Sequence, residues 1–461
     1  MKILALILAA GMGKRMKSKI PKVLHPIAGR PMIDYAIRTA AAVTGAKPYV
    51  VIGHAGELVE QALGDTAHTV RQPEQLGTGH AVLVAREALR GADTVLVLYG
   101  DTPFVKPETL ERLLAAHTAA RAKVSPLTVL SDNSMGFGRI TRDPAGAITG
   151  IVEESVAAAE QLRIRELNCG VYCFDADWLW ENLPRLPLRP KGEYYLTDTL
   201  ALAVQQGQAI ASVTIDAIEE VIGINDRVLL AQAEKAVRTQ IRERWMRAGV
   251  TLVDPDSVYI DADVELARDV TLYPNTYLKG HTVVAEDAVL GPNSIVSDSH
   301  IGARCVVTAS VVEGSVMEAD SNIGPFSHLR PGSRIGSFTH LGNYAEVKNS
   351  TLGAHISMGH FGYIGDATVG DHANIGAGTI TCNYDGVRKN HTEVGAYAFI
   401  GSDTLLVAPV AVGEGARTGA GAVVTRDVPP DSMAVGVPAR VLRRGLRQEA
   451  AGGSSAPQQE K

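Results

Sequence analysis

The sequence predicts two domains of different architecture: an α/β domain with a mostly parallel sheet, followed by a parallel β-helix. Two patterns carry this prediction. Short apolar runs alternate with helical patterns up to about residue 224, and an aliphatic residue then recurs at every sixth position between about residues 260 and 440. The length agrees, because 461 residues exceed what one hydrophobic core usually holds.

The first half reads as a series of βαβ units. The predicted strands are the apolar runs at 3–8, 48–52, 94–99 and 124–130. Helix-like segments lie between them, which favours a mostly parallel sheet. Ligands bind beyond the carboxyl ends of such strands, so the residues that follow each strand are candidates for a site. We expect this domain at 1–225 and a connecting helix at 226–249, where apolar residues have helical spacing.

The second half has a period of six residues, which fits a β-solenoid whose short flat faces each take one hexad. The aliphatic residue of each hexad is expected to point into the solenoid axis. Regular examples are Ile323, Leu329, Ile335, Leu341 and Val347, and later Val394, Ile400, Leu406 and Val412. Gly often follows the aliphatic residue, as in Ile335-Gly336, and we expect these glycines to form tight corners. The solenoid is predicted at 250–445, and the small, polar tail at 446–461 is predicted to be disordered.

Composition and charge favour small molecules, rather than nucleic acid, as the substrates. The net charge of -6 gives no basic footprint for nucleic acid, and no apolar stretch is long enough to cross a membrane. The apolar start at 3–10 is read as a buried strand rather than a signal peptide, because a loop with its own chemistry follows directly. Four scattered cysteines suggest neither a disulfide framework nor a zinc site, which favours a reduced, cytoplasmic compartment.

A Gly-rich turn follows the first predicted strand in the segment LAAGMGKRM. Glycines let backbone amides approach phosphate oxygens, and Arg15 and Lys22 can neutralise the phosphate charge. The third Gly of a dinucleotide fingerprint is missing, and so is the ending of a P-loop. Taken alone, such a segment is more often an ordinary strand-to-helix turn that carries solvated charges.

Three further signals favour a nucleotide and metal site. The Gly/Thr loop at 72–81 opens a helix and offers groups to read a base edge. Tyr99-Gly100-Asp101 ends an apolar strand on a carboxylate, and Asn225 can complete a Mg²⁺ site, since Mg²⁺ is held by one or two carboxylates plus substrate phosphates. The structural alternative makes Asp101 a helix cap and Asn225 a turn residue.

The solenoid repeat is interrupted between Ile375 and Val394 by a polar excursion at 376–389, which a solenoid does not need for stability. Insertions on repeat proteins often form binding surfaces. His360 lies shortly before it, and imidazole is suited to remove a proton near neutral pH. The other solenoid histidines are read as structural or surface residues.

The motifs LAAGMGKRM, PKVLH, EQLGTGHA, YGD, FGRI, GIVEE, ELNCG, GEYYLTD and GIND together resemble a sugar-nucleotide pyrophosphorylase domain. Joined to the hexapeptide repeat, they resemble the bacterial bifunctional family that acetylates glucosamine 1-phosphate and uridylylates N-acetylglucosamine 1-phosphate. The resemblance implies an α/β Rossmann-like nucleotidyltransferase domain followed by a left-handed parallel β-helix. It also implies UTP and acetyl-CoA as co-substrates, Mg²⁺, a homotrimer, and a product used for peptidoglycan and lipopolysaccharide.

The resemblance also implies site residues in the first domain. Arg15 and Lys22 engage phosphates as catalytic residues, and Asp101 and Asn225 bind Mg²⁺. The other residues expected to contact the UDP-sugar are Leu8, Ala9, Ala10, Gly11, Gln72, Gln75, Gly77, Thr78, Tyr99, Gly100, Gly138, Glu153, Asn168 and Tyr195.

In the solenoid the resemblance makes His360 the general base, with Glu346 as its orienting carboxylate. The amino-sugar phosphate is expected at Arg330, Lys348, Tyr363 and Asn374, with Lys389 nearby, and acetyl-CoA at Ala377, Asn383, Tyr384, Ser402 and Ala420. Four positions depart from the common family pattern: Ser155, Cys169, Gly362 and Gly436. Gly436 stands where some relatives carry an Arg that contacts CoA, which leaves Arg440, Arg443 or Arg444 to supply that charge.

Two other functions fit parts of the sequence. One is a single-activity sugar-phosphate nucleotidyltransferase whose solenoid only mediates assembly, and the other is a regulatory subunit that senses sugar nucleotides. The Asp101 and Asn225 pair argues against pure sensing, and His360 with Asn383-Tyr384 argues against a passive solenoid.

Overall fold

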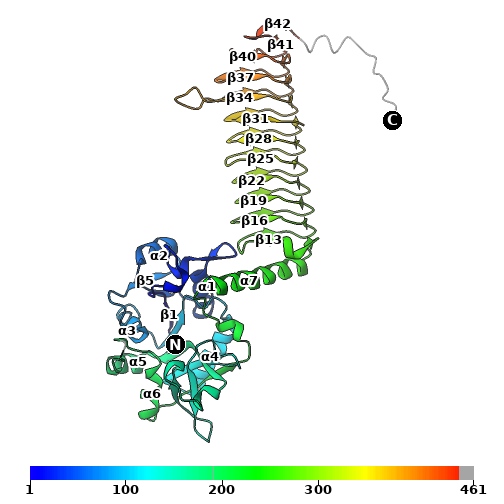
Figure 1. Ribbon diagram of the computed structural model, residues 1–461. Helices are drawn as coiled ribbons and strands as arrows, with labels where there is room; N and C mark the ends of the chain where they lie inside the picture. The colour runs from blue at the N-terminus through cyan, green and yellow to red at the C-terminus, as the bar shows by residue number, and fades with distance from the viewer. Residues whose placement is uncertain (191, 446–461) are drawn as a thin grey trace. The chain divides into compact units, whose positions relative to one another are not determined.

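The protein is described as a computed structural model that covers residues 1–190 and 192–445, so the predicted disordered tail at 446–461 lies outside the described residues. The chain divides into two compact units, Met1–Lys235 and one that begins at Ala236. The division falls within helix α7 (Arg227–Arg247), in the segment where a connecting helix is expected (Figure 1). None of the helices in the described part of the chain is long and apolar enough to cross a membrane.

The first unit is built on a sheet with the strand order β11-β7-β10-β6-β1-β4-β5, to which the β8–β9 hairpin is attached. Only β10 runs antiparallel to its neighbours in that order. The strands are β1 (Ile3–Leu8), β4 (Tyr49–Ile52), β5 (His68–Arg71), β6 (Thr94–Tyr99), β7 (Val124–Leu130), β8 (Arg139–Arg142), β9 (Ile148–Val152), β10 (Glu166–Asp175) and β11 (Val213–Ile215), with a separate small hairpin of β2 (Pro26–Ile27) and β3 (Arg30–Pro31).

Helices cover both faces of this sheet and bury two separate apolar layers. One layer contains α1 (Met32–Thr44), α2 (Gly56–Leu63) and α4 (Pro107–Ala119), and the other contains α3 (Thr78–Leu83), α5 (Ala176–Asn182) and α6 (Asp198–Gln205). Because both faces are covered, the central strands are apolar without a break, as in the fully buried run of β6. Short 3₁₀ turns complete the connections: η1 (Lys14–Met16), η2 (Lys22–Leu24), η3 (Glu154–Val156), η4 (Gln161–Arg163), η5 (Leu183–Arg185) and η6 (Ile218–Val221).

The second unit is a solenoid with three flat faces, entered through β12 and the turn η7 (Pro255–Ser257). Face I contains β12 (Thr251–Leu252), β15 (Thr271–Leu272), β18 (Val289–Leu290), β21 (Val306–Val307), β24 (Asn322–Ile323), β27 (His340–Leu341), β30 (Ser357–Met358), β33 (Asn374–Ile375), β36 (Phe399–Ile400), β39 (Arg417–Thr418), β41 (Ser432–Val435) and β42 (Arg440–Arg444). Face II contains β13 (Tyr259–Ile260), β16 (Tyr277–Lys279), β19 (Ile295–Ser297), β22 (Val311–Glu313), β25 (His328–Leu329), β28 (Ala345–Lys348), β31 (Gly362–Gly365), β34 (Ile380–Cys382), β37 (Leu405–Val407) and β40 (Val423–Val424). Face III contains β14 (Glu265–Leu266), β17 (Val283–Val284), β20 (His300–Ile301), β23 (Val316–Met317), β26 (Arg334–Ile335), β29 (Thr351–Leu352), β32 (Ala367–Val369), β35 (Thr392–Val394) and β38 (Val410–Val412).

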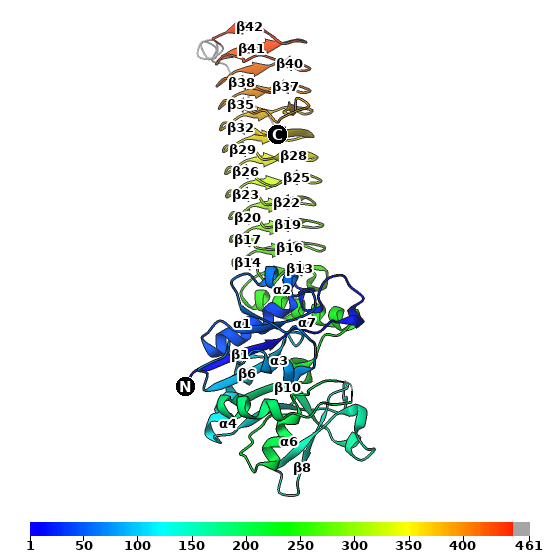
Figure 2. The same ribbon diagram turned by 90° about the vertical axis from the view of Figure 1, so that its left-hand side faces the viewer.

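Each strand of a face pairs in parallel with the strand one coil later, so the strands stack in columns along the solenoid axis (Figure 2). Only the final pair, β41 with β42, is antiparallel. This is the arrangement of a left-handed parallel β-helix, and the predicted fold class is confirmed.

The hexad aliphatics form the solenoid core, as predicted. Ile335, Leu341, Val347, Ile400 and Leu406 are all fully buried. Buried hydroxyl side chains occupy the position two residues before many of them and bind carbonyls within the coil and in the next one. Ser333 Oγ, for example, donates to the carbonyls of Arg330 (2.7 Å) and Val347 (3.1 Å). The interior is therefore apolar, with its backbone acceptors satisfied by small polar side chains.

The glycines that follow the aliphatics do not form the corners, which corrects the expectation from sequence. A Cβ on Gly336 would lie 2.5 Å from the Gly353 carbonyl carbon, and one on Gly342 would lie 1.9 Å from the Gly359 oxygen. These positions are glycine because the next coil approaches so closely. The left-handed corner residue comes three residues after the aliphatic and carries a side chain, as at Phe338 with a φ of 58°.

Corner side chains of successive coils stack on one another. The rings of Phe338, His355, His372 and Tyr397 form a continuous row, with centroids 4.7–4.9 Å apart. Their stacking offsets part of the cost of the left-handed backbone, which for a residue with a side chain is of order 1 kcal/mol.

Replacing an inward aliphatic is expected to destabilise the solenoid far more than replacing an outward one. Leu341→Ala removes a fully buried side chain and should lower the free energy of unfolding by about 2–5 kcal/mol. Val306→Ala, at a 37% exposed position of the same face, should cost well under half as much. Thermal and denaturant unfolding of the two variants test this. Equal losses would contradict the assignment of inward and outward positions.

Candidate active sites

The first unit has a cavity of about 330 Å³ at the carboxyl ends of β1 and β6. The Gly-rich turn and the second Gly/Thr loop meet there. The lining residues expected from sequence are Leu8, Ala9, Ala10, Gly11, Lys22, Gln72, Gln75, Gly77, Thr78, Tyr99, Asp101 and Tyr195. Parallel strands bring segments separated by up to 190 residues to one edge of the sheet, as the βαβ pattern predicts.

A second cavity of about 400 Å³ adjoins the first and shares Thr78, Tyr99, Asp101 and Tyr195 with it. The residues expected to hold the sugar and metal line this cavity: Gly138, Glu153, Asn168 and Asn225. Together the two cavities form one elongated site with the Asp101 carboxylate at the junction.

Two expected residues lie elsewhere. Arg15, on η1, is exposed and lines neither cavity. Gly100 is buried under the site, where a Cβ would lie 3.3–3.4 Å from Ile33, Val23 and Ala9. Gly100 thus lets the strand end pack closely against α1, whereas Arg15 has to move to contact a ligand in the cavities.

Lys22 lies where Asp101 and Asn225 converge. Its ammonium contacts the Asp101 carboxylate and donates to Asn225 Oδ1 at 3.0 Å. Two oxygen ligands directed at one cation fit Mg²⁺, which takes its remaining ligands from water and substrate phosphates. No group of three or more His, Cys, Asp or Glu among residues 1–190 and 192–445 could hold an ion by itself. Asp101 and Asn225 thus offer two oxygen ligands, which by themselves are too few for a complete metal site.

The segment 193–197 connects the Gly/Thr loop at 72–81 to Glu153 in the second cavity, a connection that the sequence did not reveal. Tyr194 exchanges backbone hydrogen bonds with the loop, accepting from Gly79 and donating to Leu76, both at 2.8 Å. Thr197 Oγ1 donates to Glu153 Oε1 at 3.1 Å. The only sequence signal was the motif GEYYLTD, from which Tyr195 alone was selected, although Glu193 and Thr197 also line the cavities.

An ion pair between the buried Arg139 and the partly exposed Glu154 lies beside the second cavity. Arg139 is 4% exposed, and its Nη1 donates to the Phe137 carbonyl (2.6 Å) and to Glu154 Oε2 (2.5 Å). The hydrogen bond from Arg139, followed by those from Ser134 and the Gly136 backbone, lowers the pKa of Glu154. The pair thereby joins the segment that carries Gly138 to the turn that follows Glu153.

The two family departures in this half differ in their surroundings. Ser155 is exposed and lines the second cavity, the one expected from sequence to hold the sugar. The Cys169 side chain is 4% exposed and belongs to the apolar layer of α1 and α4, where burial raises the pKa of its thiol. A Cys at this position therefore alters core packing, and the thiol does not act as a nucleophile at neutral pH.

In the second unit, His360 lies in a groove of about 600 Å³ that runs across face I. Of the residues expected at the acetyl-transfer site, Asn374, Ala377, Ser402 and Ala420 also line it. Gly359 and Gly376 form part of its floor, and four residues not selected from sequence complete the wall: Ser357, Phe399, Arg417 and Met433.

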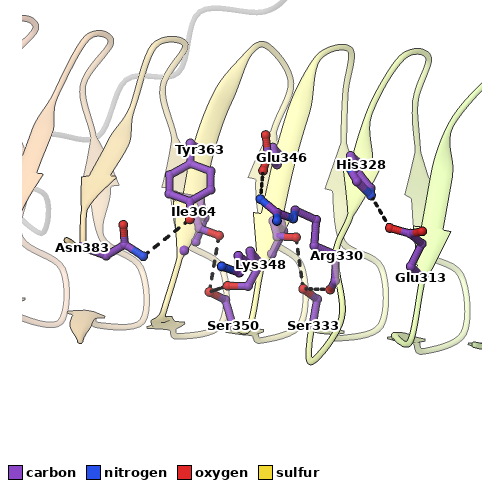
Figure 3. A network of polar contacts seen from close by, with 12 residues as sticks. Glu313, His328, Arg330, Ser333, Glu346, Lys348, Ser350, Tyr363, Ile364 and Asn383 are labelled. Carbon is purple, nitrogen blue, oxygen red and sulfur yellow. Dashed lines mark hydrogen bonds and ion pairs between the residues drawn. The ribbon is translucent and has the colours of Figure 1, made fainter. Parts of the chain in front are cut away.

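A separate polar network occupies the outer surface of face II (Figure 3). Its pairs run diagonally between successive coils: His328 Nε2 with Glu313 at 2.8 Å, and Arg330 Nη1 with Glu346 Oε1 at 3.0 Å. In the next coil the diagonal pairs Lys348 with Tyr363, which has no charge to offset the ammonium. Cationic charge accumulates at this point of the face.

Lys348 is held among other cations. The neighbouring Lys389 ammonium, together with Arg330, lowers the pKa of Lys348. A bound anion would stabilise the charged form of such a lysine. A phosphate monoester is a suitable anion, because its oxygens accept charge-assisted hydrogen bonds from lysine and arginine. The cluster of Lys348, Lys389 and Arg330 is therefore a candidate anion site.

Asp366 connects this cation cluster to the polar excursion. It accepts from Asn349 Nδ2 (2.6 Å) and from Asn383 Nδ2, and Asn383 also lies 3.5 Å from the Tyr363 hydroxyl. Burial alone would raise the pKa of Asp366, but the bonds from the two asparagines and the nearby lysines hold it below the usual value. Beyond Asn383 the excursion closes as a hairpin, with Asn390 N donating to the Asn383 carbonyl and Tyr384 61% exposed.

One expected contact and one expected grouping differ from the structure. Glu346 pairs with Arg330 one coil away, and among the described residues no hydrogen bond joins it to His360. Asn383 and Tyr384, expected with acetyl-CoA, lie with the face II cations, whereas Asn374, expected with the sugar phosphate, lies in the groove of His360. Residues that are close in the sequence thus belong to different faces of the coil.

These features define a two-site transferase: an α/β unit with a nucleotide-sized site at the strand ends, and a β-helix with a histidine-containing groove and a separate anion site.

The family model described as "MobA-like NTP transferase domain" matches residues 5–135. The chain is 47% identical over 433 residues to the "Bifunctional protein GlmU" of Heliobacterium modesticaldum, covering 94% of both chains. It is 43% identical to the protein of that name from Streptococcus thermophilus, covering 96% of both, and 44% identical to that from Pelobacter propionicus, covering 96% of this chain and 98% of the relative.

The chain belongs to the bifunctional GlmU family. The resemblance inferred from the motifs is therefore confirmed, and so is the prediction of an enzyme with two transferase activities.

The anion site on face II predicts stabilisation by phosphate. Inorganic phosphate should increase the free energy of unfolding of the second unit by RT ln(1 + [L]/Kd), about 1.4 kcal/mol at ten times Kd, and should thereby raise its melting temperature. Lys348→Met should remove most of this effect. Lys279→Met is the matched control, because Lys279 lies in the same column of face II four coils earlier. Thermal unfolding with a phosphate titration measures all three proteins, and an equal phosphate effect in wild type and Lys348→Met would contradict the assignment.

Proposed function

We propose that this bifunctional enzyme makes UDP-N-acetylglucosamine in two steps. The second unit transfers an acetyl group from acetyl-CoA to glucosamine 1-phosphate, and the first unit then transfers uridylyl from UTP to N-acetylglucosamine 1-phosphate. The observation that carries the proposal is the presence of two chemically different sites in separate units. One combines a Gly-rich turn with Lys22 and Asp101, and the other combines His360 with a long groove.

Uridylyl transfer needs alignment more than an activated side chain. The sugar phosphate is already an ionised nucleophile, so its oxygen attacks the α-phosphorus of UTP while the bond to the β-phosphate bridging oxygen breaks and pyrophosphate leaves. In this proposal the turn that ends in Gly11 binds the nucleotide phosphates, and Lys22 offsets the charge that develops on them. Glu153, positioned by Thr197, and Asn168 hold the sugar hydroxyls and amide.

Asp101 and Asn225 are the residues that would hold Mg²⁺. When bound there together with the nucleotide, the metal supplies neutralisation of phosphate charge. Lys22, which contacts both side chains, is then available to interact with the phosphates.

Acetyl transfer uses His360 as the base. The imidazole removes a proton from the amino group of glucosamine 1-phosphate, the amine nitrogen attacks the thioester carbonyl, and the carbon–sulfur bond breaks to release CoA. The Lys348, Lys389 and Arg330 cluster binds the 1-phosphate in this proposal, and the groove that contains Ala377, Ser402 and Ala420 takes acetyl-CoA.

We also propose that the enzyme is a homotrimer. His360 precedes β31, whereas Lys348 is in register with Gly365 at the other end of that strand. Strands rise about 3.3 Å per residue, so the base and the anion site of one coil are separated by roughly 10–15 Å. A second copy that places its anion site against the His360 groove would complete the site, and three copies would close the arrangement. We also propose that the enzyme works in the cytoplasm, where UTP and acetyl-CoA are available.

Single substitutions should separate the two activities. His360→Ala is expected to reduce acetyl transfer by about 10²–10⁴-fold and to leave uridylyl transfer unchanged, because the base is lost while the first unit is intact. Asp101→Ala should do the reverse. Coupled assays of pyrophosphate and free thiol release measure both reactions. Full acetyl transfer by His360→Ala would exclude it as the base, and a wild type without acetyl transfer would favour the single-activity alternative.

Direct metal binding tests the Asp101 and Asn225 pair without catalysis. Mn²⁺ titrations followed by electron paramagnetic resonance, in the absence of nucleotide, should show weaker binding to Asp101→Asn than to wild type. Lys22→Met should bind Mn²⁺ about tenfold more tightly, because the competing ammonium is gone. Lys14→Met is the control, because Lys14 is an exposed cation on the neighbouring turn η1, and it should match wild type. Identical Mn²⁺ affinities for wild type, Asp101→Asn and Lys22→Met would reject the metal site.

A further inference from the structure

The groove of face I continues past His360 toward the end of the solenoid, and it is lined by in-register columns of residues. The floor column contains Gly376, Gly401 and Gly419, where a Cβ on the first two would lie 2.6 Å from backbone atoms of the next coil. At Gly359 a Cβ would meet nothing within 4 Å, so the groove is open beside His360. Coil packing therefore enforces a continuous floor without side chains.

One wall of the groove is a column of outward side chains. Successive strand pairings connect Ser357, Asn374, Phe399, Arg417, Met433 and Arg443 in that order. The β41–β42 ladder has a register shift between Met433 and Ala434, and on the Met433 side of it Arg443 is the cross-strand partner of Met433. Cross-strand partners point to the same side of a sheet, so Arg443 extends the wall that Arg417 and Met433 form. The column is polar beside His360, apolar at Phe399, and cationic at Arg417 and Arg443.

The spacing of this column matches the length of acetyl-CoA, the donor in the proposed function. Neighbouring strands lie about 4.8 Å apart, which places Arg417 about 14 Å and Arg443 about 24 Å from the strand that precedes His360. The pantetheine arm between the thioester sulfur and the first phosphorus is comparable to about four residues of extended chain, or about 15 Å. An acetyl group at His360 therefore brings the diphosphate to the level of Arg417.

We propose that Arg417 binds the diphosphate of acetyl-CoA and that Arg443 binds the phosphate on its adenosine. This inference rests on the proposed acetyltransferase function and names the residues of that site that select the donor. A guanidinium binds phosphate oxygens through two parallel hydrogen bonds, which suits both contacts. Phe399, before Arg417 in the column, supplies apolar surface for the pantetheine arm, and Met433 supplies it for the nucleoside between the two arginines. The two arginines provide the cationic charge that position 436, a glycine in this chain, does not.

Arg443 is assigned rather than Arg440 because of the register of β41 with β42. Arg440 pairs with Val435, in the column that continues the groove floor, whereas Arg443 pairs with Met433 in the wall. Val435 closes the floor, since a Cβ on Gly419 would lie 2.7 Å from its Cγ1. Arg440 thus lies behind Val435, beyond the end of the groove.

Three donors of decreasing length test the assignment: acetyl-CoA, its 3′-dephospho form, and S-acetylpantetheine, which lacks the diphosphate and the nucleoside. Arg417→Met should raise KM for the first two donors about tenfold to a hundredfold, with little change in kcat, and should leave kcat/KM for S-acetylpantetheine unchanged. Arg443→Met should raise KM about tenfold for acetyl-CoA alone. Arg417→Lys should raise KM less than Arg417→Met does, because lysine keeps the positive charge but cannot make the two parallel hydrogen bonds of a guanidinium.

Arg426→Met is the matched control, because Arg426 is an exposed cation of the same coil that follows the face II strand β40. It should behave as wild type with every donor. Unchanged uridylyl transfer and melting temperature verify that each variant is folded. An equal loss with S-acetylpantetheine, or no loss with acetyl-CoA, would overturn the assignment of Arg417.

Calorimetric binding of CoA itself separates this inference from the proposed function. Absence of acetyl transfer by wild type would reject the function, whereas equal CoA affinity of wild type, Arg417→Met and Arg443→Met would reject the two phosphate contacts. Weaker CoA binding by both variants, with wild-type affinity in Arg426→Met, is the expected result.

Discussion

The second unit depends on one constraint: the backbone of each coil finds its hydrogen-bond partners in the coil before and the coil after it. Gly342 N donates to the Met358 carbonyl, for example, and Arg330 N donates to that of Val347. Coils must therefore approach to the strand spacing of a sheet on all three faces at once. This requirement excludes a Cβ at positions such as Gly342 and Gly376, and it leaves the interior wide enough for one layer of aliphatic side chains.

The same constraint arranges the outer side chains for function. In-register stacking converts a spacing of 16–18 residues in the sequence into contact in space, as between Arg330 and Glu346. A ligand that lies along the solenoid axis contacts one residue of a column in each coil. Successive coils can therefore bind successive parts of a long cofactor. The first unit follows a different rule, since its parallel strands end at one edge and bring Leu8, Tyr99 and Asp101 together there.

The elements that sequence patterns predicted are those fixed by local periodicity. Strands β1, β6 and β7 match the predicted bounds, β4 begins one residue later, and the hexad aliphatics are buried as expected. A period identifies the inward position without knowledge of the neighbours, because every coil repeats it. The βαβ pattern likewise located the carboxyl edge of the sheet, and with it most of the cavity lining.

What the sequence did not reveal depends on contacts between coils or between distant loops. Glu346 is near His360 in the chain, yet Arg330 is its partner, because the diagonal neighbour on the face lies in the preceding coil. Cys169 borders the second cavity, yet its side chain is 4% exposed and packs in the apolar layer of α1 and α4, which no spacing in the sequence indicated. The position of Thr197 beside Glu153 could not be predicted, because no spacing rule connects residues that are 44 positions apart; the structure shows it through their hydrogen bond.

The hairpin after Asn383 shows how such a solenoid can acquire new parts. On face III, Thr351 pairs with Thr368 after 17 residues, but Thr368 pairs with Glu393 after 25, and the ladder continues without a shift. The extra residues leave the plane of the coil at one corner and return to the same point. Chain length and stacking geometry are thus independent at the corners. Loops of very different size can be exchanged there without repacking the interior, which makes each corner a modular position for inserting segments that bind new ligands.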